Sequence, residues 1–322
     1  MRVALLGAGG FLGTHLAAHL AASARFADQA IDEVLLFDQR PVAAPAAARC
    51  PVRIQHGDLR DDTALDALFA APVDAVLHLA ATLTVDAETD VRRGLDTNVL
   101  AFVALLERCR AQASVPMLLF ASSIATFGGP LPAVVGDGMP QRPTTSYGTH
   151  KAVAELLLAD YSRRGFVDGR ALRLPIVLTH PGPASGSISD QVAALVRGPL
   201  RGERTICRMA PDSPLATASV HKVVQGFLRL AALPAAALPL GGSMNLPGLS
   251  VTPAALLQAV ARQLPAGQVP VVDWQPDPAV QRIVDGWPQA FTSEHALSLG
   301  FTPDASADAL VQSFLAQERA AP

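Results

Sequence analysis

The chain contains few cysteines, and their small number excludes two kinds of site. Its 322 residues include only three, Cys50, Cys109 and Cys207, which lie far apart and lack CxxC spacing. An odd and sparse cysteine count is typical of a reducing compartment and argues against a disulfide framework or a zinc site. We therefore expect no metal.

Long apolar runs and a secretion signal are also missing. The most apolar stretch, from Leu230 to Leu240, is interrupted by Pro234 and Pro239, so it cannot form a membrane span. The first residues enter an apolar segment at once, without the basic, apolar and cleavage regions of a signal peptide. We expect a cytoplasmic protein without a membrane partner.

Charge is scarce as well. Only 16% of the residues are charged, the formal net charge is -3, and 50% of the residues are hydrophobic. This weak acidic excess gives no electrostatic reason to bind nucleic acid or an anionic membrane. The apolar content excludes a disordered chain and suffices for a large core.

What the first half does contain is an alternation of short apolar runs with helical patterns. Such an alternation predicts an α/β protein with a Rossmann doubly wound parallel sheet and helices on both faces. The expected strands are Val3–Leu6, Val34–Phe37, Val52–Gln55, Ala75–Leu79 and Met117–Phe120, and the expected helices are Leu12–Ala24, Ala64–Ala70 and Val91–Ala111.

A glycine-rich segment follows the first expected strand and opens the first expected helix. Small residues there permit a tight turn, close approach of the backbone to a pyrophosphate, and close packing of helix on strand. Backbone N–H groups at the helix N-terminus then hold the phosphates. We expect a dinucleotide site that includes Gly7, Gly10, Phe11, Leu12 and Gly13.

Asp38 ends the second expected strand, downstream of that loop. A carboxylate at this position can accept hydrogen bonds from the adenosine ribose and repels a 2′-phosphate, which favours NAD over NADP. Arg40 lies two residues later and partly offsets the repulsion, so the preference need not be absolute. An aspartate that only caps a turn is the alternative, and the loop upstream weighs against it.

Tyr147 and Lys151 lie four residues apart on an expected helix that opens at Ser146, so they share one face. A free phenol has a pKa near ~10, and a neighbouring ammonium or an oxidised nicotinamide lowers it. The tyrosinate can then accept a proton from a substrate hydroxyl. A surface pair packed along a helix is the alternative.

The serine pair Ser122 and Ser123 favours the catalytic interpretation over the surface pair. It follows the fifth expected strand at the sheet edge where open α/β sheets bind ligands. A hydroxyl there can hydrogen-bond the substrate oxygen opposite Tyr147. Serines that simply end a strand would be the default interpretation without Tyr147 downstream.

These jointly spaced motifs resemble the extended short-chain dehydrogenase/reductase family. The resemblance covers nearly the whole chain. The matching pieces are the loop from Gly7 to Gly13, Asp38, His56–Leu59, His78–Ala81, Asn98, Ser122–Ser123, Tyr147 with Lys151, and Leu299–Pro303.

The resemblance implies roles for individual residues. Ser123, by its offset from Phe127 and Gly128, matches the family's catalytic hydroxyl, beside Tyr147 and Lys151. Asn98 is implied to support the catalytic lysine. The implied cofactor contacts are Asp58 and Leu59 at the adenine, Leu79, Ala80 and Ala81 on the nicotinamide ribose side, and Lys151 at the ribose.

Three segments, Phe127–Pro132, Ser146–Lys151 and Asp160–Pro175, resemble the D-erythronate dehydrogenase branch of that family. The branch oxidises the C2 hydroxyl of a four-carbon sugar acid to the 2-oxo acid with NAD, and the resemblance implies the same reaction here. Residues 209–219 lack the arginine and tryptophan expected in the branch. A changed loop leaves open a related aldonic acid as substrate.

Two other functions share the fold. Nucleotide-sugar epimerases and dehydratases have the same catalytic set, but Pro175 stands where they usually present an asparagine to the diphosphate. Ile124, not an acidic residue, follows Ser123, which disfavours an elimination. A non-enzymatic NAD(P)-sensing regulator is disfavoured because Tyr147 and Lys151 are both present.

Substrate contacts are expected at positions spread along the chain. A carboxylate substrate needs a cationic clamp, for which Arg142 and Arg208 are candidates by position, although surface arginines are an equal alternative. Thr82, just after the fourth strand, is a further candidate against the alternative of a strand-end turn. The resemblance also implies a homodimer built on helices that include residues 91–111 and 146–164.

The pattern changes after Leu174. Prolines and glycines between 181 and 186 indicate a loop, and strands become sparse. Thr252 followed by Pro253 predicts a helix through Arg262, and apolar spacing predicts a closing helix over 305–318. We expect residues 1–175 to form the NAD-binding domain with the catalytic residues. Residues 176–322 would form a smaller, mainly helical substrate-binding portion, with some elements interleaved.

Overall fold

The computed structural model describes residues 1–178 and 188–320, so the loop expected between 181 and 186 lies outside the described residues. The chain forms two compact units from interleaved segments. The first comprises Met1–Thr126, Thr145–Arg173 and Val224–Met244, and the second comprises Phe127–Thr144, Leu174–Val223 and Asn245–Pro322.

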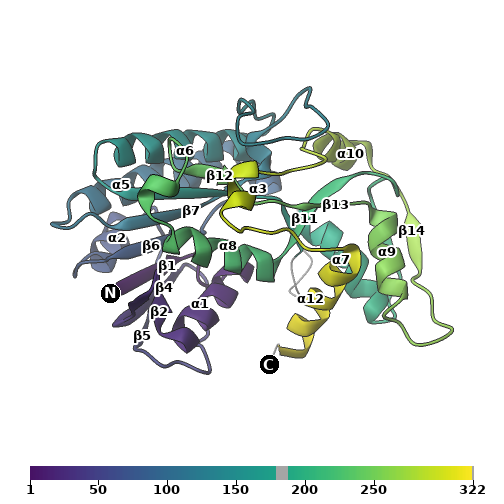
Figure 1. The fold of residues 1–322 in the computed structure, drawn as a ribbon, viewed down its shortest axis with the longest axis horizontal. Helices are drawn as coiled ribbons and strands as arrows, with labels where there is room; N and C mark the ends of the chain where they lie inside the picture. The colour runs from purple at the N-terminus through teal and green to yellow at the C-terminus, as the bar shows by residue number, and fades with distance from the viewer. Residues whose placement is uncertain (179–187, 321–322) are drawn as a thin grey trace. The chain divides into compact units, whose positions relative to one another are not determined.

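The first unit is built on a sheet of seven strands in the order β12-β8-β7-β6-β1-β4-β5 (Figure 1). β1 pairs in parallel with β4 and β6, and β4–β5 and β6–β7 are also parallel. This is the doubly wound order, which reverses between β1 and β6, so the Rossmann prediction is confirmed. The strands are β1 (Arg2–Leu6), β4 (Glu33–Asp38), β5 (Val52–His56), β6 (Ala75–His78), β7 (Met117–Ser123), β8 (Asp168–Leu174) and β12 (Ser243–Asn245).

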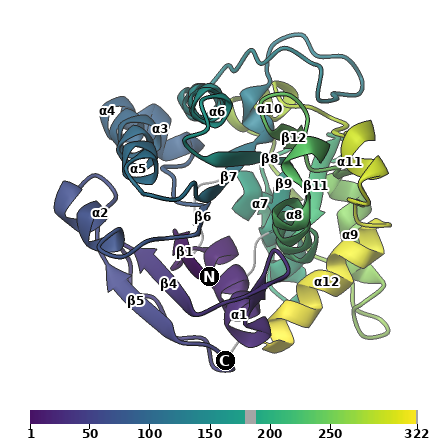
Figure 2. The ribbon, with the colours of Figure 1, turned by 60° about the vertical axis from the view of Figure 1, so that its left-hand side comes forward.

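Helices cover both faces of this sheet. Figures 1 and 2 show α2 (Asp62–Leu68), α5 (Ala101–Arg110) and α6 (Ser146–Arg163) on one face. The opposite face carries α1 (Phe11–Ser23) and α8 (Val220–Ala232).

One expected helix is interrupted, which corrects the prediction over 91–111. α4 (Val91–Leu95) passes into a π-helical turn, η1 (Asp96–Leu100), before α5 begins. A π-helical turn holds one more residue per hydrogen-bonded ring than an α-helix and often marks a functional site. The sequence did not predict the preceding short helix α3 (Thr84–Thr89) or the hairpin of β2 (Arg25–Phe26) and β3 (Gln29–Ala30).

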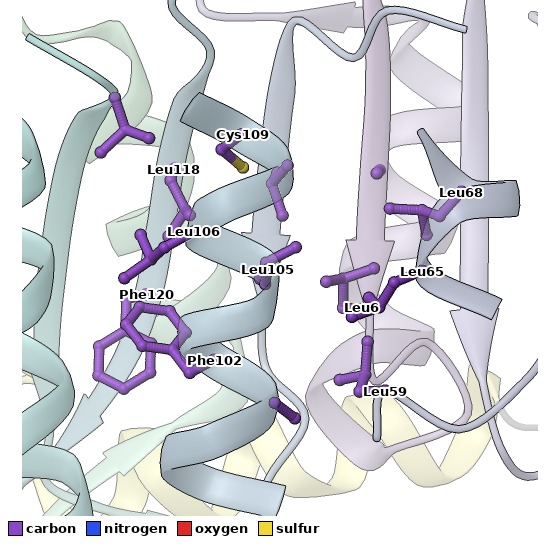
Figure 3. Close-up of a cluster of buried hydrophobic side chains, with 14 of the residues drawn as sticks. Leu6, Leu59, Leu65, Leu68, Phe102, Leu105, Leu106, Cys109, Leu118 and Phe120 are labelled. Atoms are coloured by element: carbon purple, nitrogen blue, oxygen red, sulfur yellow. The ribbon is translucent and has the colours of Figure 1, made fainter. Parts of the chain in front are cut away.

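A hydrophobic cluster lies between the sheet and the helices α2 and α5 (Figure 3). Phe102, Leu105 and Leu106 share one face of α5 and meet Leu118 and Phe120 of β7. Each of these five side chains is at most 1% exposed. Burying a large apolar side chain stabilises the fold by roughly 1.5–3 kcal/mol, so this cluster is a main support of the sheet.

The second unit contains helices and small sheets, one in the order β13-β11-β9 and one of β10 with β14. Thr252 caps α9 by accepting a hydrogen bond from the backbone N–H of Ala255 at 3.1 Å, as the Thr-Pro pair predicts. Its elements include β9 (Ile176–Leu178), α7 (Ile188–Leu200), β10 (Thr205–Cys207), β11 (Leu215–Ser219), β13 (Leu249–Val251), α9 (Pro253–Ala261), β14 (Val272–Trp274), α10 (Pro278–Asp285), α11 (Glu294–Ser298) and α12 (Ala307–Ala320).

A buried carboxylate fixes the segment before the last helix. Asp304 accepts hydrogen bonds from the backbone N–H and from the hydroxyl of Ser219, both at 2.8 Å. This explains how the residues that follow Leu299–Pro303 are held against β11. Within the described residues, no helix is long and apolar enough to cross a membrane.

Truncation of Phe102 tests the core of the first unit. The ring lies 5.3 Å from the ring of His78 and 4.9 Å from that of Phe120, centroid to centroid, and is fully buried. We expect Phe102→Ala to lower the free energy of unfolding by about 3–5 kcal/mol, measured by urea denaturation. Leu240→Ala, at a fully exposed side chain of the same unit, should change it by less than about 0.5 kcal/mol. Equal losses in the two variants would contradict the assignment of the core.

Candidate active site

The glycine-rich loop is shaped by close backbone approaches. Gly7 has φ +89°, and a Cβ there would lie 2.7 Å from the backbone nitrogen of Ala80. A Cβ on Gly13 would lie 2.1 Å from the carbonyl oxygen of Gly7. Both contacts exclude a side chain, so the loop, the start of α1 and the end of β6 are packed as one structure.

The N-terminus of α1 is open to an anion. Gly10 caps the helix without a side-chain hydrogen bond, and the first turn carries no acidic residue. Backbone N–H groups at such a terminus carry partial positive charge and bind phosphate. The loop therefore fits a dinucleotide pyrophosphate, with Phe11, Leu12 and Gly13 in the first turn.

Asp38 lies beside this loop at the end of β4, and its carboxylate is buried. One oxygen accepts a hydrogen bond from the backbone N–H of Gly9 at 2.9 Å, and the other accepts from the backbone N–H of Arg40 at 2.8 Å. The guanidinium of Arg40 lies 3.5 Å from the same carboxylate and is 62% exposed. Asp38 thus fixes the loop and places a negative charge beside it, which fits a hydrogen-bonding role toward a ribose.

Five further expected cofactor residues follow the carboxyl ends of β5 and β6. Leu79, Ala80 and Ala81 follow β6, and the N–H of Leu79 donates to Leu6 at 2.9 Å. Leu59 is buried, whereas the carboxylate of Asp58 binds the guanidinium of Arg60, with a shortest distance of 2.6 Å. That hydrogen bond with Arg60 lowers the pKa of Asp58.

The three expected catalytic residues come together in the first unit. Ser123 is the last residue of β7, and Tyr147 and Lys151 lie on α6. The hydroxyls of Ser123 and Tyr147 are hydrogen-bonded to each other. The ammonium nitrogen of Lys151 donates to the carbonyl of Ala121 at 2.7 Å and lies 5.6 Å from the centroid of the Tyr147 ring.

Burial acts on both ionisable groups of this set. It raises the pKa of Tyr147 to about 12, against a smaller lowering by the hydrogen bond with Ser123. It lowers the pKa of Lys151 to about 7, against a smaller raising by Glu155. In the protein alone, desolvation therefore outweighs the hydrogen bond with Ser123 in setting the pKa of Tyr147.

Three hydrogen bonds join α6 to three consecutive residues of β7. Ala121, Ser122 and Ser123 are consecutive on the strand, and their partners on the helix are four residues apart. Ala121 accepts from Lys151, the hydroxyl of Ser122 donates to Glu155, and Ser123 bonds with Tyr147. Since residues four apart share a helix face, the whole face is fixed against the strand end. Thr145 caps α6 by accepting from the N–H of Gly148 at 3.1 Å.

Asn98 lies in the π-helical turn and is 4% exposed. Its amide oxygen accepts from the N–H of Thr82 and its amide nitrogen donates to the carbonyl of Thr82, both at 2.8 Å. The same nitrogen lies 3.4 Å from Nδ1 of His150, the residue before Lys151. Asn98 therefore anchors the loop that carries Thr82 and reaches Lys151 only through its neighbour.

Three expected residues belong to the second unit. Arg142 is exposed. Arg208 is 55% exposed, and its guanidinium lies 3.5 Å from the carboxylate of Asp277. Pro175 is buried between β8 and β9, and a Cβ on Gly248 would lie 3.0 Å from its Cβ.

The sequence interpretation missed Glu155 and Arg173, which form a buried ion pair behind the catalytic set with a distance of 2.7 Å. Two signals pointed to them. Glu155 continues the four-residue spacing of Tyr147 and Lys151, and Arg173 is a charged residue inside an apolar strand. The described residues contain no group of three or more His, Cys, Asp or Glu that could hold a metal ion.

Known proteins resemble this chain over nearly its full length. It is 39% identical to the D-erythronate dehydrogenase of Cupriavidus necator over 319 residues, which are 98% of each chain. It is 36% identical to the D-erythronate dehydrogenase of Haemophilus influenzae over 316 residues, covering 98% of this chain and 99% of that one. A nucleoside-diphosphate-sugar epimerase from Agrobacterium tumefaciens has a structure with a TM-score of 0.93 at 30% identity, covering 100% of this chain and 95% of that one.

The model of the NAD dependent epimerase/dehydratase family matches residues 3–209, which span the glycine-rich loop, Asp38 and the serine–tyrosine–lysine set. With this match and these relatives, the chain belongs to the NAD dependent epimerase/dehydratase family, within the extended short-chain dehydrogenases/reductases.

Proposed function

We propose that this nicotinamide-dependent oxidoreductase oxidises the C2 hydroxyl of D-erythronate, or of a related aldonic acid, to the 2-oxo acid with NAD. One observation carries the proposal. Ser123, Tyr147 and Lys151 meet at the carboxyl edge of the sheet in a chain that matches two D-erythronate dehydrogenases over 98% of its length.

The residues divide the chemistry among them. The hydroxyl of Ser123 holds the substrate oxygen, and the phenolate of Tyr147 accepts the hydroxyl proton. Lys151 stabilises the phenolate and donates to the cofactor ribose. Oxidised nicotinamide, when bound, supplies a positive charge that lowers the pKa of Tyr147 and accepts the hydride from C2.

The geometry of the glycine-rich loop supports the proposed cofactor contacts. Gly7, Gly10, Phe11, Leu12 and Gly13 hold the pyrophosphate, and Asp38 binds the adenosine ribose. The remaining proposed cofactor contacts are Asp58, Leu59, Leu79, Ala80, Ala81, Asn98, Tyr147, Lys151 and Pro175.

We propose that residues 1–175 form the NAD-binding domain and carry the catalytic residues. Residues 176–322 form the substrate-binding portion, with some elements interleaved. Thr82, Arg142 and Arg208 are the proposed substrate contacts beside Ser123, with one arginine bound to the substrate carboxylate. The three cysteines are free thiols, which suits the proposed cytoplasmic location.

Nucleotide-sugar epimerisation is the second candidate, favoured by the TM-score of 0.93 with the Agrobacterium tumefaciens epimerase. Pro175 and Ile124 weigh against it, since neither can hydrogen-bond through its side chain to a diphosphate or act as an acid. A panel of aldonic acids and nucleotide sugars assayed with NAD separates the two reactions. Net NADH formation on an aldonic acid supports the dehydrogenase, and sugar inversion without NADH release supports the epimerase.

Removal of one hydroxyl tests the proposed base. Tyr147→Phe keeps the ring but cannot accept the proton, so kcat on D-erythronate should fall roughly 10²–10⁴-fold, measured by NADH formation. Tyr161→Phe is the matched control, because Tyr161 bonds to Glu107 on the surface of α5, and its kcat should stay within about twofold. Full activity of Tyr147→Phe would exclude Tyr147 as the base.

Neutralising Asp38 tests the cofactor preference. Asp38→Asn removes the charge that repels a 2′-phosphate, and the ratio of kcat/KM for NADP to that for NAD should rise at least about tenfold. Asp66→Asn, which neutralises a surface carboxylate paired with Arg108, serves as the control and should leave the ratio unchanged. An unchanged ratio in Asp38→Asn would show that another residue sets the preference.

We also propose that the protein is a homodimer through α6 and the segment around η1. These elements contact one another and carry apolar side chains that are exposed to solvent. Val153 is 36% exposed, Leu156 69%, Leu95 37% and Leu100 48%. Clustered exposed apolar side chains are typical of a subunit interface.

A charge on this surface tests the dimer. Leu156→Glu should halve the mass in analytical ultracentrifugation, because an unpaired carboxylate would be buried at the interface. Leu240→Glu, at a fully exposed leucine outside this surface, should leave the mass unchanged. A wild-type protein that sediments as a monomer would rule out this assembly.

A further inference from the structure

The carboxylate of Glu155 is buried behind the catalytic residues, between α6, β7 and β8. It is 3% exposed and accepts a hydrogen bond from the hydroxyl of Ser122. Nε of Arg173 lies 3.0 Å from each of its oxygens, and Nη2 of Arg173 lies 2.7 Å from one. Arg173 is itself only 8% exposed. Such charge-assisted hydrogen bonds fix the position of a carboxylate.

Lys151 lies one helical turn before Glu155, and its ammonium faces groups from several elements. From β7 it meets the carbonyl of Ala121 and the ring of Phe120, whose centroid is 4.5 Å away. His78 of β6 and His150 of α6 are uncharged neighbours, since burial lowers the pKa of both, that of His78 to about 3. Glu155 is the group whose negative charge favours the ammonium.

The ammonium nitrogen of Lys151 lies 5.6 Å from the centroid of the Tyr147 ring, so an ammonium and a phenolate at these positions would attract each other. After the pair has lost one proton, the remaining proton resides either on the phenol or on the amine. Only the form with an ammonium and a phenolate can accept a proton from a substrate hydroxyl. A negative charge beside Lys151 stabilises this reactive form, whereas desolvation alone favours the form with both groups neutral.

We propose that Glu155, held by Arg173 and Ser122, is a positioning residue that keeps the shared proton of the Tyr147–Lys151 pair on Lys151. The catalytic consequence rests on the proposed function, in which Tyr147 is the base. The protonation step itself is independent of the substrate and is measured without it.

The sequence makes a direct measurement feasible, because the chain has only two tyrosines, Tyr147 and Tyr161. In the full-length Tyr161→Phe protein, the ultraviolet absorbance of tyrosinate reports on Tyr147 alone. The titration is recorded from neutral to alkaline pH, with and without NAD, and its midpoint is compared between variants.

The decisive variant removes both buried charges. Glu155→Gln combined with Arg173→Met avoids leaving an unpaired cation, which alone can unfold the protein. Glu155→Asp keeps the charge on a shorter side chain. Asp160→Asn is the matched control, because Asp160 is a surface carboxylate on the same helix that is paired with Arg163.

We expect the midpoint for tyrosinate formation to rise by at least about one pH unit in the double variant. It should rise less in Glu155→Asp and stay unchanged in Asp160→Asn. The kcat on D-erythronate at neutral pH should fall about tenfold for each unit of the rise, with little change in KM. A folded double variant with an unmoved midpoint overturns the proposal and leaves the network a structural role.

Ser122→Ala is the second variant, for the case that the double variant does not fold. It keeps every charge and removes one hydrogen bond to Glu155, so the midpoint should rise in the same direction by a smaller amount. An unmoved midpoint again overturns the proposal. Failure of the proposed function is distinguishable, because a wild-type enzyme inactive on every aldonic acid would still show the tyrosinate titration.

Discussion

Three successive bonds between β7 and α6 hold the catalytic region together. A strand advances about 3.3 Å per residue, whereas four residues of a helix advance about 6 Å. Bonds from three consecutive strand residues to three helix residues four apart therefore fix both the rotation of α6 and its position along its axis. No single side chain could do this, and the bonds through Ala121 and Ser122 help to hold Tyr147 within hydrogen-bonding distance of Ser123.

Burial and neighbouring charge have opposite effects on the protonation of the catalytic residues between β7 and α6. Desolvation drives Tyr147 and Lys151 toward their neutral forms, yet proton abstraction needs both of them charged. A second buried pair offsets this desolvation. Because Glu155 and Arg173 are both buried and paired, they hold fixed charges next to the catalytic residues.

The sequence predicted the elements whose signals are local. Glycine spacing, apolar runs and the four-residue spacing of Tyr147 and Lys151 indicated the Rossmann sheet, the dinucleotide loop and the helix face. It could not reveal that Ser122 bonds to Glu155, because that contact joins residues 33 positions apart. The short strands after residue 174 also escaped, since three to five residues show too little of a period. The sequence could not reveal that burial raises the pKa of Tyr147, because burial is a tertiary property.

The π-helical turn at residues 96–100 makes two separate contacts depend on the number of residues between them. Asn98 must face the backbone of Thr82, while Phe102 and Leu105 must face the sheet. Each residue added to or lost from a helix turns everything beyond it by about 100°. A single-residue insertion or deletion between Asn98 and Phe102 would thus swing the core face of α5 into solvent. Over evolutionary time, the length of this stretch should stay constant.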